Sequence, residues 1–216
     1  MDGKPPSERT RVKRYNWLAR YDRQTVYDIL DAMPLCFVGY VIDARPYVTP
    51  TMQWREGDRI FWHGSSASRM LRAAEGNEVC LTVSLIDGLV LARSAYNYNL
   101  NHRSVMIFGE AQKIVDPEEK AAHLRAMVNR FVPGQWERLR PVLPQELKAT
   151  TVLSMSLEEA SAKVRVGQPE DEEADYDFPV WAGVVPIRLD IGEPIDDPRN
   201  LPQVEMPEDV LKFRIG

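Results

Sequence analysis

The chain has 216 residues, 44% of them hydrophobic and 27% charged, a balance typical of a soluble globular protein with a substantial core. Its formal net charge of -5 disfavours nucleic acid as a partner, because nucleic-acid-binding proteins usually carry a basic face. No apolar run is long enough to cross a membrane, and the N-terminus lacks an apolar stretch of the secretory kind. We therefore expect a cytoplasmic protein without a membrane contact, in which Cys36 and Cys80 are reduced thiols.

Behind a basic N-terminal arm, the pattern predicts a helix over residues 23–33 with Asp22 as its cap. Strands are expected over residues 35–42 and 47–54. Because Pro50 cannot donate a ladder hydrogen bond, the second strand should lie at an edge or carry a bulge. One face of this strand carries Val48, Pro50, Met52 and Trp54, and the other carries Tyr47, Thr49, Thr51 and Gln53.

A strand over residues 59–63 leads into a short helix over residues 68–75, which Gly76 ends. Asp87-Gly88 lies between two apolar runs and is a strong hairpin signal. The flanking strands are expected over residues 78–85 and 89–95.

A long strand is predicted over residues 104–115, in which Gly109 marks a bulge or a close approach. Asp116, followed by proline and two glutamates, opens a helix that extends to residue 131. Its buried stripe is expected to be Leu124, Met127, Val128 and Phe131. Later strands are expected over residues 151–156, 162–166 and 181–190.

Many strands with few helices between them favour an antiparallel barrel of six or seven strands over a βαβ nucleotide fold. The acidic segment 168–177 is expected to be an exposed loop rather than a site. We expect an N-terminal arm over residues 1–20, a barrel domain over residues 21–190 and an extended tail over residues 191–216.

Catalytic motifs that act through their own side chains are missing from the sequence. It has no glycine-rich dinucleotide fingerprint, no Walker A loop, no HExxH and no GxSxG. None of the three histidines, His63, His102 and His123, stands at a metal-ligand spacing from another. No metal site is therefore expected, and no catalytic residue is assigned.

The segment "FWHGSSASRM" over residues 61–70 is the strongest local signal, and two interpretations remain open. Free backbone N–H groups at a helix start, small hydroxyl residues and Arg69 could together cradle a phosphate. The same residues could simply be a capped helix start, with Ser68 as the N-cap.

The segments "FWHGSSASRM", "VCLTV", "DGLVLARSA" and "RSVMIFGEA", in this order and spacing, resemble the pyridoxamine 5'-phosphate oxidase-like family of FMN-binding split barrels. The likeness extends over about residues 21–166 and is greatest to the branch that includes nitroimidazole-reductase-like proteins. It implies a mainly β fold, a six-stranded antiparallel split barrel. It also implies a homodimer with FMN sites at the interface.

In such proteins one strand lies along the flavin ring, a strand end and turn hold the phosphate and ribityl chain, and a basic residue contacts the phosphate. The cofactor-binding residues that the resemblance implies are Val48, Thr49, Pro50, Thr51, Met52, Trp62, His63, Gly64, Ser65, Ser66, Ser68, Arg69, Arg103 and Ser104.

The sequence also departs from the family pattern. Ser104 stands where the oxidase has glutamine, and Ser68 stands where a second basic residue is expected. The run "YNYNLNH" over residues 96–102 lacks two histidines found in relatives. Because the tail has no match to the oxidase's C-terminal arginine motif, oxidation of pyridoxamine phosphate is not expected.

Three functions remain open. The leading one is an FMN-dependent oxidoreductase with an unknown small-molecule substrate, in which the flavin carries the redox chemistry. The second is a non-catalytic binding module for flavin, deazaflavin or haem, with His63 as a possible iron ligand. The third is a barrel that has lost its site and acts as a structural or regulatory dimer. Trp62 could equally be a core residue, and His63 a hydrogen-bonded strand end.

Overall fold

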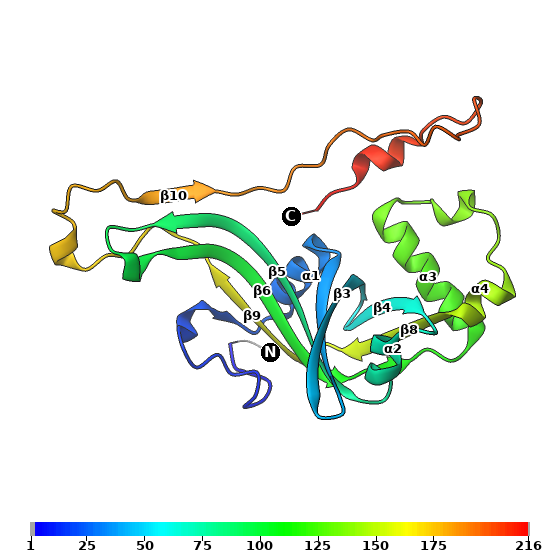
Figure 1. Ribbon diagram of the computed structural model, residues 1–216, viewed down its shortest axis with the longest axis horizontal. Coiled ribbons are helices and arrows are strands. Elements are labelled where there is room, and N and C mark those ends of the chain that lie inside the picture. The colour runs from blue at the N-terminus through cyan, green and yellow to red at the C-terminus, as the bar shows by residue number, and fades with distance from the viewer. Residues whose placement is uncertain (1–2, 216) are drawn as a thin grey trace.

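The computed structural model describes residues 3–215 as a mainly β fold, in which a long antiparallel sheet curls around the core (Figure 1). Within that range the strands are β1 (Ala19–Arg20), β2 (Leu35–Ile42), β3 (Arg45–Glu56), β4 (Arg59–Ser65), β5 (Glu78–Leu91), β6 (Asn99–Glu110), β7 (Gln112–Lys113), β8 (Thr150–Ser156), β9 (Glu159–Arg165) and β10 (Gly183–Pro186). The α-helices are α1 (Arg23–Ala32), α2 (Arg69–Ala74), α3 (Pro117–Phe131) and α4 (Pro144–Ala149).

The strands follow the order β1-β9-β6-β5-β2-β3-β4-β8-β7, and β10 pairs with β5. The predicted mainly β, antiparallel class is confirmed. The sheet has ten strands rather than the six or seven expected, because the short strands β1, β7 and β10 join it. None of the described helices is both long and apolar enough to span a membrane.

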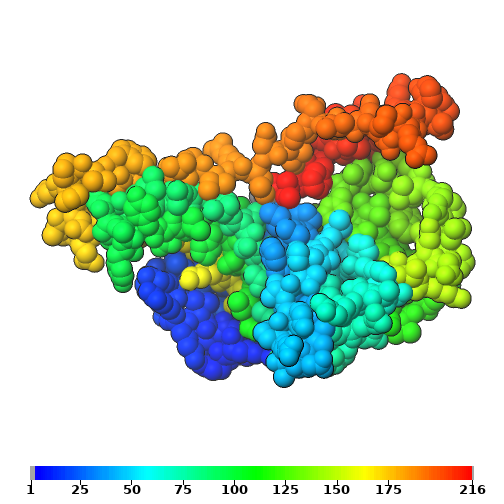
Figure 2. Space-filling view, in the orientation of Figure 1, coloured from blue at the N-terminus to red at the C-terminus, as the bar shows by residue number. Residues whose placement is uncertain are grey.

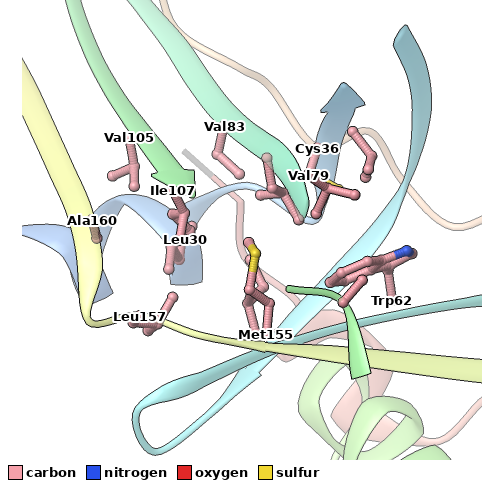
Figure 3. Close-up of a cluster of buried hydrophobic side chains, with 14 of the residues drawn as sticks. Leu30, Cys36, Trp62, Val79, Val83, Val105, Ile107, Met155, Leu157 and Ala160 are labelled. Atoms are coloured by element: carbon pink, nitrogen blue, oxygen red, sulfur yellow. The ribbon is translucent and has the colours of Figure 1, made fainter. Parts of the chain in front are cut away.

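The main core lies inside the curled sheet and is closed by α1 and α2. Along β2, Cys36 and Val38 are fully buried, as the alternation of a half-buried strand requires. Figure 3 shows Leu30 of α1, Trp62 of β4 and Met155 of β8 in the same cluster.

Both cysteines are free thiols, as expected. Cys36 lies on the core side of β2, and burial raises the pKa of its thiol to about 12. Cys80 of β5 pairs with Gly39, one register position from the core-facing residues, and so lies on the opposite face of the sheet. The two sulfurs cannot meet across the sheet.

The three predicted helices are confirmed, and each begins at its predicted cap. The Asp22 carboxylate accepts a hydrogen bond from the Thr25 N–H at 2.8 Å. Asp116 likewise accepts from the Glu119 N–H at 2.8 Å. Ser68 caps α2, and a positive φ of 70° at Gly76 follows its end. Helix α4 was not predicted, although Pro144 at its first position is a recognised start signal.

The predicted hairpin at Asp87-Gly88 is wrong, because β5 runs straight through these residues with a local bulge. The chain turns instead over residues 92–98. Gly88 serves a different purpose: a Cβ there would lie 3.0 Å from Cγ1 of Val184 and 3.2 Å from the Val185 carbonyl. The glycine therefore leaves room for β10 rather than making a turn.

The predicted strand over residues 104–115 is wrong at both ends. β6 begins at the polar Asn99, because it pairs with the outer half of β5, and it ends at Glu110. The predicted close approach at Gly109 is confirmed, since a Cβ there would lie 2.9 Å from Cγ of Met155. The predicted stripe of α3 is only partly right: Leu124 is buried, whereas Met127, Val128 and Phe131 are half-buried.

β3 is an edge at Pro50, as predicted. It pairs there with β2 on one side, and its pairing with β4 begins only at Gln53. Beyond Gln53, the strands β3, β4, β7 and β8 carry a second apolar cluster under α3. This cluster, called the α3 cluster below, consists of Trp54, Phe61, Ile114, Leu124 and Val152.

The acidic segment 168–177 is mostly exposed, but its Asp171 is fixed. The Asp171 carboxylate accepts hydrogen bonds from the Arg93 N–H at 3.0 Å and from its guanidinium at 3.2 Å. It also accepts from the Asn97 side chain at 3.4 Å. Through Asp171 the segment is therefore attached to the connection between β5 and β6. From β10 onward the chain forms an arm along one side of the molecule (Figure 2).

Candidate functional site

β4 presents Trp62 and His63 to opposite faces of the sheet, because successive strand residues alternate. Trp62 is fully buried in the main core, and its indole N–H has no hydrogen-bond partner there. His63 points the other way and lies half-buried beside the α3 cluster. The two neighbours in sequence therefore do not share an environment.

The imidazole of His63 is held by packing rather than by hydrogen bonds. Its ring lies edge to face with Trp54 at 5.8 Å between centroids. Its Nδ1 atom is buried and has no hydrogen-bond partner among residues 3–215. Burial lowers the pKa of His63, because the charged form loses water. A neutral imidazole with an unpartnered nitrogen can act as a ligand to a transition metal.

A carboxylate that the sequence did not reveal fixes the surroundings of His63. Glu56 Oε1 accepts a hydrogen bond from the Trp54 indole at 2.7 Å and lies 2.9 Å from Nδ1 of His123. The His123 ring in turn packs against Phe61 at 4.3 Å. These contacts of Glu56 and His123 attach α3 to β3 and β4, and they place Trp54 against His63.

A largely apolar surface lies next to His63 on the outer side of β2 and β3. The register pairs Leu35 with Met52 and Gly39 with Val48, so these residues share one face. Gln53 pairs with Trp62, so these two side chains lie on the same face of the sheet. Met52 and His63 are each one residue away from this pair, and they therefore share the opposite face. This surface, called the open sheet face below, carries the exposed side chains of Leu35, Phe37, Val41, Val48, Pro50 and Met52.

The predicted stretch from Val48 to Met52 is thus divided between two faces. Val48, Pro50 and Met52 belong to the open sheet face. Thr49 points inward, where its hydroxyl lies 3.0 Å from that of the buried Tyr40. Thr51 shares this inward side.

The loop after His63 is a capped helix start. The Ser68 hydroxyl accepts from the Leu71 N–H at 3.4 Å, and the Ser66 N–H donates to the Ala149 carbonyl at 2.8 Å. The Ser65 hydroxyl accepts from the following Ala67 N–H at 3.2 Å.

Gly64 lies close to α2, since a Cβ there would lie 3.1 Å from Cδ1 of Leu71. Arg69 is the cation that this turn presents to solvent. Its guanidinium lies over the Tyr47 ring at 4.9 Å, and no ion pair to it is found within residues 3–215. A capped helix start and an exposed arginine are compatible with a phosphate at this turn.

Arg103 and Ser104 have partners of their own. The guanidinium of Arg103 forms a two-pronged pair with Asp87, at 2.9 and 2.7 Å. Hydrogen bonding to Asp87 raises the pKa of Arg103. The Ser104 hydroxyl donates to the Lys163 carbonyl at 3.5 Å. In the part of the chain that the structure describes, no hydrogen bond joins either residue to the turn around Arg69.

No group of three or more His, Cys, Asp or Glu side chains suited to a metal ion is found among the described residues. A metal held here would therefore have to bring most of its ligands with it, as the iron of a porphyrin does.

The fold and the site together define an antiparallel split-barrel protein with an open apolar face beside a half-buried histidine, and with an exposed arginine at the turn that follows. The chain belongs to the pyridoxamine 5'-phosphate oxidase family, whose model matches residues 22–164. The resemblance noted from the sequence is therefore confirmed. No curated protein sequence matches the chain.

The similar solved structures include the following three. A flavocytochrome, Anf3 from Azotobacter vinelandii, is 60% identical, with a TM-score of 0.97 over 99% of this chain and 100% of that chain. A FAD and haem binding protein from Mycobacterium smegmatis is 32% identical, with a TM-score of 0.86 over 91% and 97%. A putative 5-nitroimidazole antibiotic resistance protein from Bacteroides thetaiotaomicron is 25% identical, with a TM-score of 0.56 over 68% and 86%.

Proposed function

We propose that this chain is a flavocytochrome: an oxidoreductase that binds a flavin nucleotide and haem. The observation that carries the proposal is the 60% identity to a flavocytochrome over nearly the whole of both chains. The similar protein from Mycobacterium smegmatis, named for both cofactors, supports the same conclusion independently. A flavin supplies two-electron chemistry and a haem supplies one-electron chemistry, so a protein with both can couple the two.

The residues present fit a haem at His63. A porphyrin iron needs an axial ligand with a free lone pair, and the half-buried His63 offers an imidazole that no described residue hydrogen-bonds; because its Nδ1 is buried, Nε2 would be the ligating nitrogen. The porphyrin ring also needs apolar contact, which the adjoining Leu35 and Met52 provide. The edge-to-face contact with Trp54 would keep the imidazole ring in position.

The residues also fit a flavin phosphate at the turn over residues 64–69. Arg69 is exposed, lies over the Tyr47 ring and has no acidic partner among the described residues. A guanidinium can contact two phosphate oxygens at once. The barrel resemblance favours FMN, whereas the name of the Mycobacterium smegmatis protein specifies FAD. We propose FAD as the flavin because that protein matches 91% of this chain.

A homodimer is part of this proposal. Phe37 of β2, Val48 of β3 and Met106 of β6 expose 39%, 67% and 43% of their surface on one face of the sheet, and exposed apolar patches of this kind mark association surfaces. A partner subunit over these residues would leave the end of the open sheet face with Leu35, Met52 and His63 for the haem. The free cysteines fit a reducing compartment, and we propose the cytoplasm.

Analysis of the purified chain's pigments tests the proposal. After incubation with FAD, FMN and hemin, followed by gel filtration, we expect flavin and haem to co-elute with the protein. Chromatography of the released flavin distinguishes FAD from FMN. If the protein retains flavin but no haem, the haem part of the proposal is wrong and the chain is a flavoprotein. If it retains neither, the whole proposal is wrong.

A further inference from the structure

The N-terminal segment, residues 3–23, carries a charge opposite to that of the whole chain. It holds seven Lys and Arg residues against two acidic residues, whereas the chain has a formal net charge of -5. The proposed flavin and haem sites use none of these cations. A basic surface on an otherwise acidic protein attracts anions to that one place.

This segment is fixed to the sheet, on the face opposite to the main core. Arg9 forms ion pairs with Glu78 of β5 at 2.8 Å and with Glu159 of β9. Its guanidinium also lies over the Phe108 ring of β6, at 5.1 Å from the centroid. The strand β1, which follows, pairs with β9 at Lys163. The segment is therefore part of the fold, and its side chains have defined neighbours.

Two cations and an exposed indole meet at the ring of Tyr15. The Arg14 guanidinium lies 5.1 Å from the centroid of this ring, and the Lys163 ammonium lies 5.5 Å from it. The Trp17 ring packs edge-on against Tyr15 at 5.1 Å, yet Trp17 is 63% exposed. Within residues 3–215, neither Arg14 nor Lys163 forms an ion pair. Positive charge without an acidic partner therefore lies beside an accessible aromatic surface.

A cleft of about 620 Å³ adjoins this cluster. Trp17 and Tyr21 line it together with Arg11 and Lys13, and none of the described acidic residues does. Glu8 pairs with both of these cations, at 2.8 and 3.3 Å, but its side chain is 68% exposed. Because two cations share one exposed carboxylate, and exposed ion pairs are weak, a phosphate can compete for them.

The lining of the cleft has the chemistry that recognises a nucleotide. Nucleobases stack on exposed aromatic rings, and guanidinium and ammonium groups pair with phosphate oxygens. Small-molecule sites are concave and combine aromatic side chains with a few polar groups, and the cleft has a volume usual for them. A concave lining of this kind fits a small anion with a ring better than it fits an acidic protein.

We propose that the N-terminal segment forms a binding site for a nucleotide that carries two or more phosphates. Trp17 stacks on the base, and Arg11 and Lys13 bind the phosphates. Arg14 and Lys163 add positive charge at the side of the cleft. The site uses none of the residues assigned to flavin or haem, so the inference goes beyond the proposed function and does not depend on it.

The test is calorimetric titration of the full chain, loaded with whichever flavin it retains. The ligands are ATP and NADP⁺, and inorganic pyrophosphate is the probe for phosphate alone. We expect micromolar binding of at least one nucleotide and weaker binding of pyrophosphate. Trp17→Ala should lower the nucleotide affinity by about tenfold, because the stacking contact is lost. Trp181→Ala is the matched control, since this residue is 68% exposed and does not line the cleft.

Absence of nucleotide binding at millimolar concentration would overturn the proposal, as would equal affinities of the two tryptophan variants. If pyrophosphate binds as tightly as the nucleotides, the surface is a general anion patch, open to an acidic protein, and the proposal is wrong. It is also wrong if the nucleotides bind only by displacing the flavin, which absorption of the filtrate detects.

If Trp17→Ala melts early, R11Q/K13Q decides the question, because both of these side chains are exposed. A selective loss of nucleotide affinity in that variant supports the site, and an unchanged affinity excludes it. Flavin and haem retention, which tests the proposed function, is measured on the same samples. The two proposals can therefore fail independently of each other.

Discussion

Trp54 and His63 lie edge to face, with ring centroids 5.8 Å apart and ring planes at 64°. The indole is itself held by Glu56, which also contacts His123 of α3. Glu56 therefore controls how firmly α3 is seated over β4, and through Trp54 it controls where the His63 imidazole stands. A residue outside every sequence motif thus supports the proposed ligand.

Glu56→Ala should destabilise the protein by about 1–3 kcal/mol, because the indole N–H and the His123 nitrogen lose their common acceptor in a partly buried place. Chemical denaturation measures this change in the free energy of unfolding. Glu119→Ala is the control: Glu119 lies 3.7 Å from the same histidine but is 56% exposed, so a change near zero is expected. Equal changes in the free energy of unfolding for the two variants would show that the contacts of Glu56 do not stabilise the protein more than an exposed ion pair does.

Arg69→Ala should weaken flavin binding by about tenfold or more, since a charge-assisted contact to phosphate is lost. The measurement is a titration with FAD and FMN, followed by quenching of the flavin fluorescence. Arg72→Ala provides a matched control in the same helix, because the Arg72 guanidinium already donates to the Ala67 carbonyl at 2.6 Å. Loss of affinity in both variants alike would indicate general electrostatics rather than a phosphate contact.

Asp22→Ala should cost about 1 kcal/mol of stability at neutral pH, the usual value of an N-cap. The hydrogen bond from the Thr25 N–H lowers the pKa of Asp22 in the folded state. The stability that this shift contributes is therefore present above the unfolded pKa and is lost as the pH falls through the folded one. Unfolding curves of wild type and variant should converge in acid, and a gap independent of pH would contradict this.

Gly88→Ala should loosen β10, because the added methyl group would meet Val184 at 3.0 Å and the Val185 carbonyl at 3.2 Å. We expect faster tryptic cleavage within the arm at Arg188 and Arg199. The exposed Ser84, on the same strand, supplies the control S84A, which should be cleaved at the wild-type rate. Unchanged cleavage of the glycine variant would mean that β10 does not hold the arm.

Local signals in the sequence were enough to predict much of the fold. The caps at Asp22, Ser68 and Asp116 are all found, because a cap depends on residues within one turn. The alternation along β3 correctly separated Thr49 from Val48. It could not show which of these faces would be buried, since that depends on the strand pairing.

Apart from helix α4, what the sequence did not reveal involves partners distant in the sequence. The glycine at position 88 resembles a turn residue, yet it makes space for a strand about one hundred residues later. Glu56 and His123 are 67 positions apart, and no spacing rule connects them. The acidic segment 168–177 is a mostly exposed loop, as predicted, but its composition did not show that Asp171 would accept a hydrogen bond from Arg93.

The central claim is that His63 binds haem in a protein that also binds flavin, and one comparison tests it most directly. Absorption spectra of wild type and His63→Gln are recorded after incubation with FAD and hemin and removal of the excess. The account predicts flavin bands in both proteins, and a Soret band that is lost or shifted only in the variant. A Soret band of wild-type position and strength in His63→Gln would contradict it and move the iron ligand elsewhere.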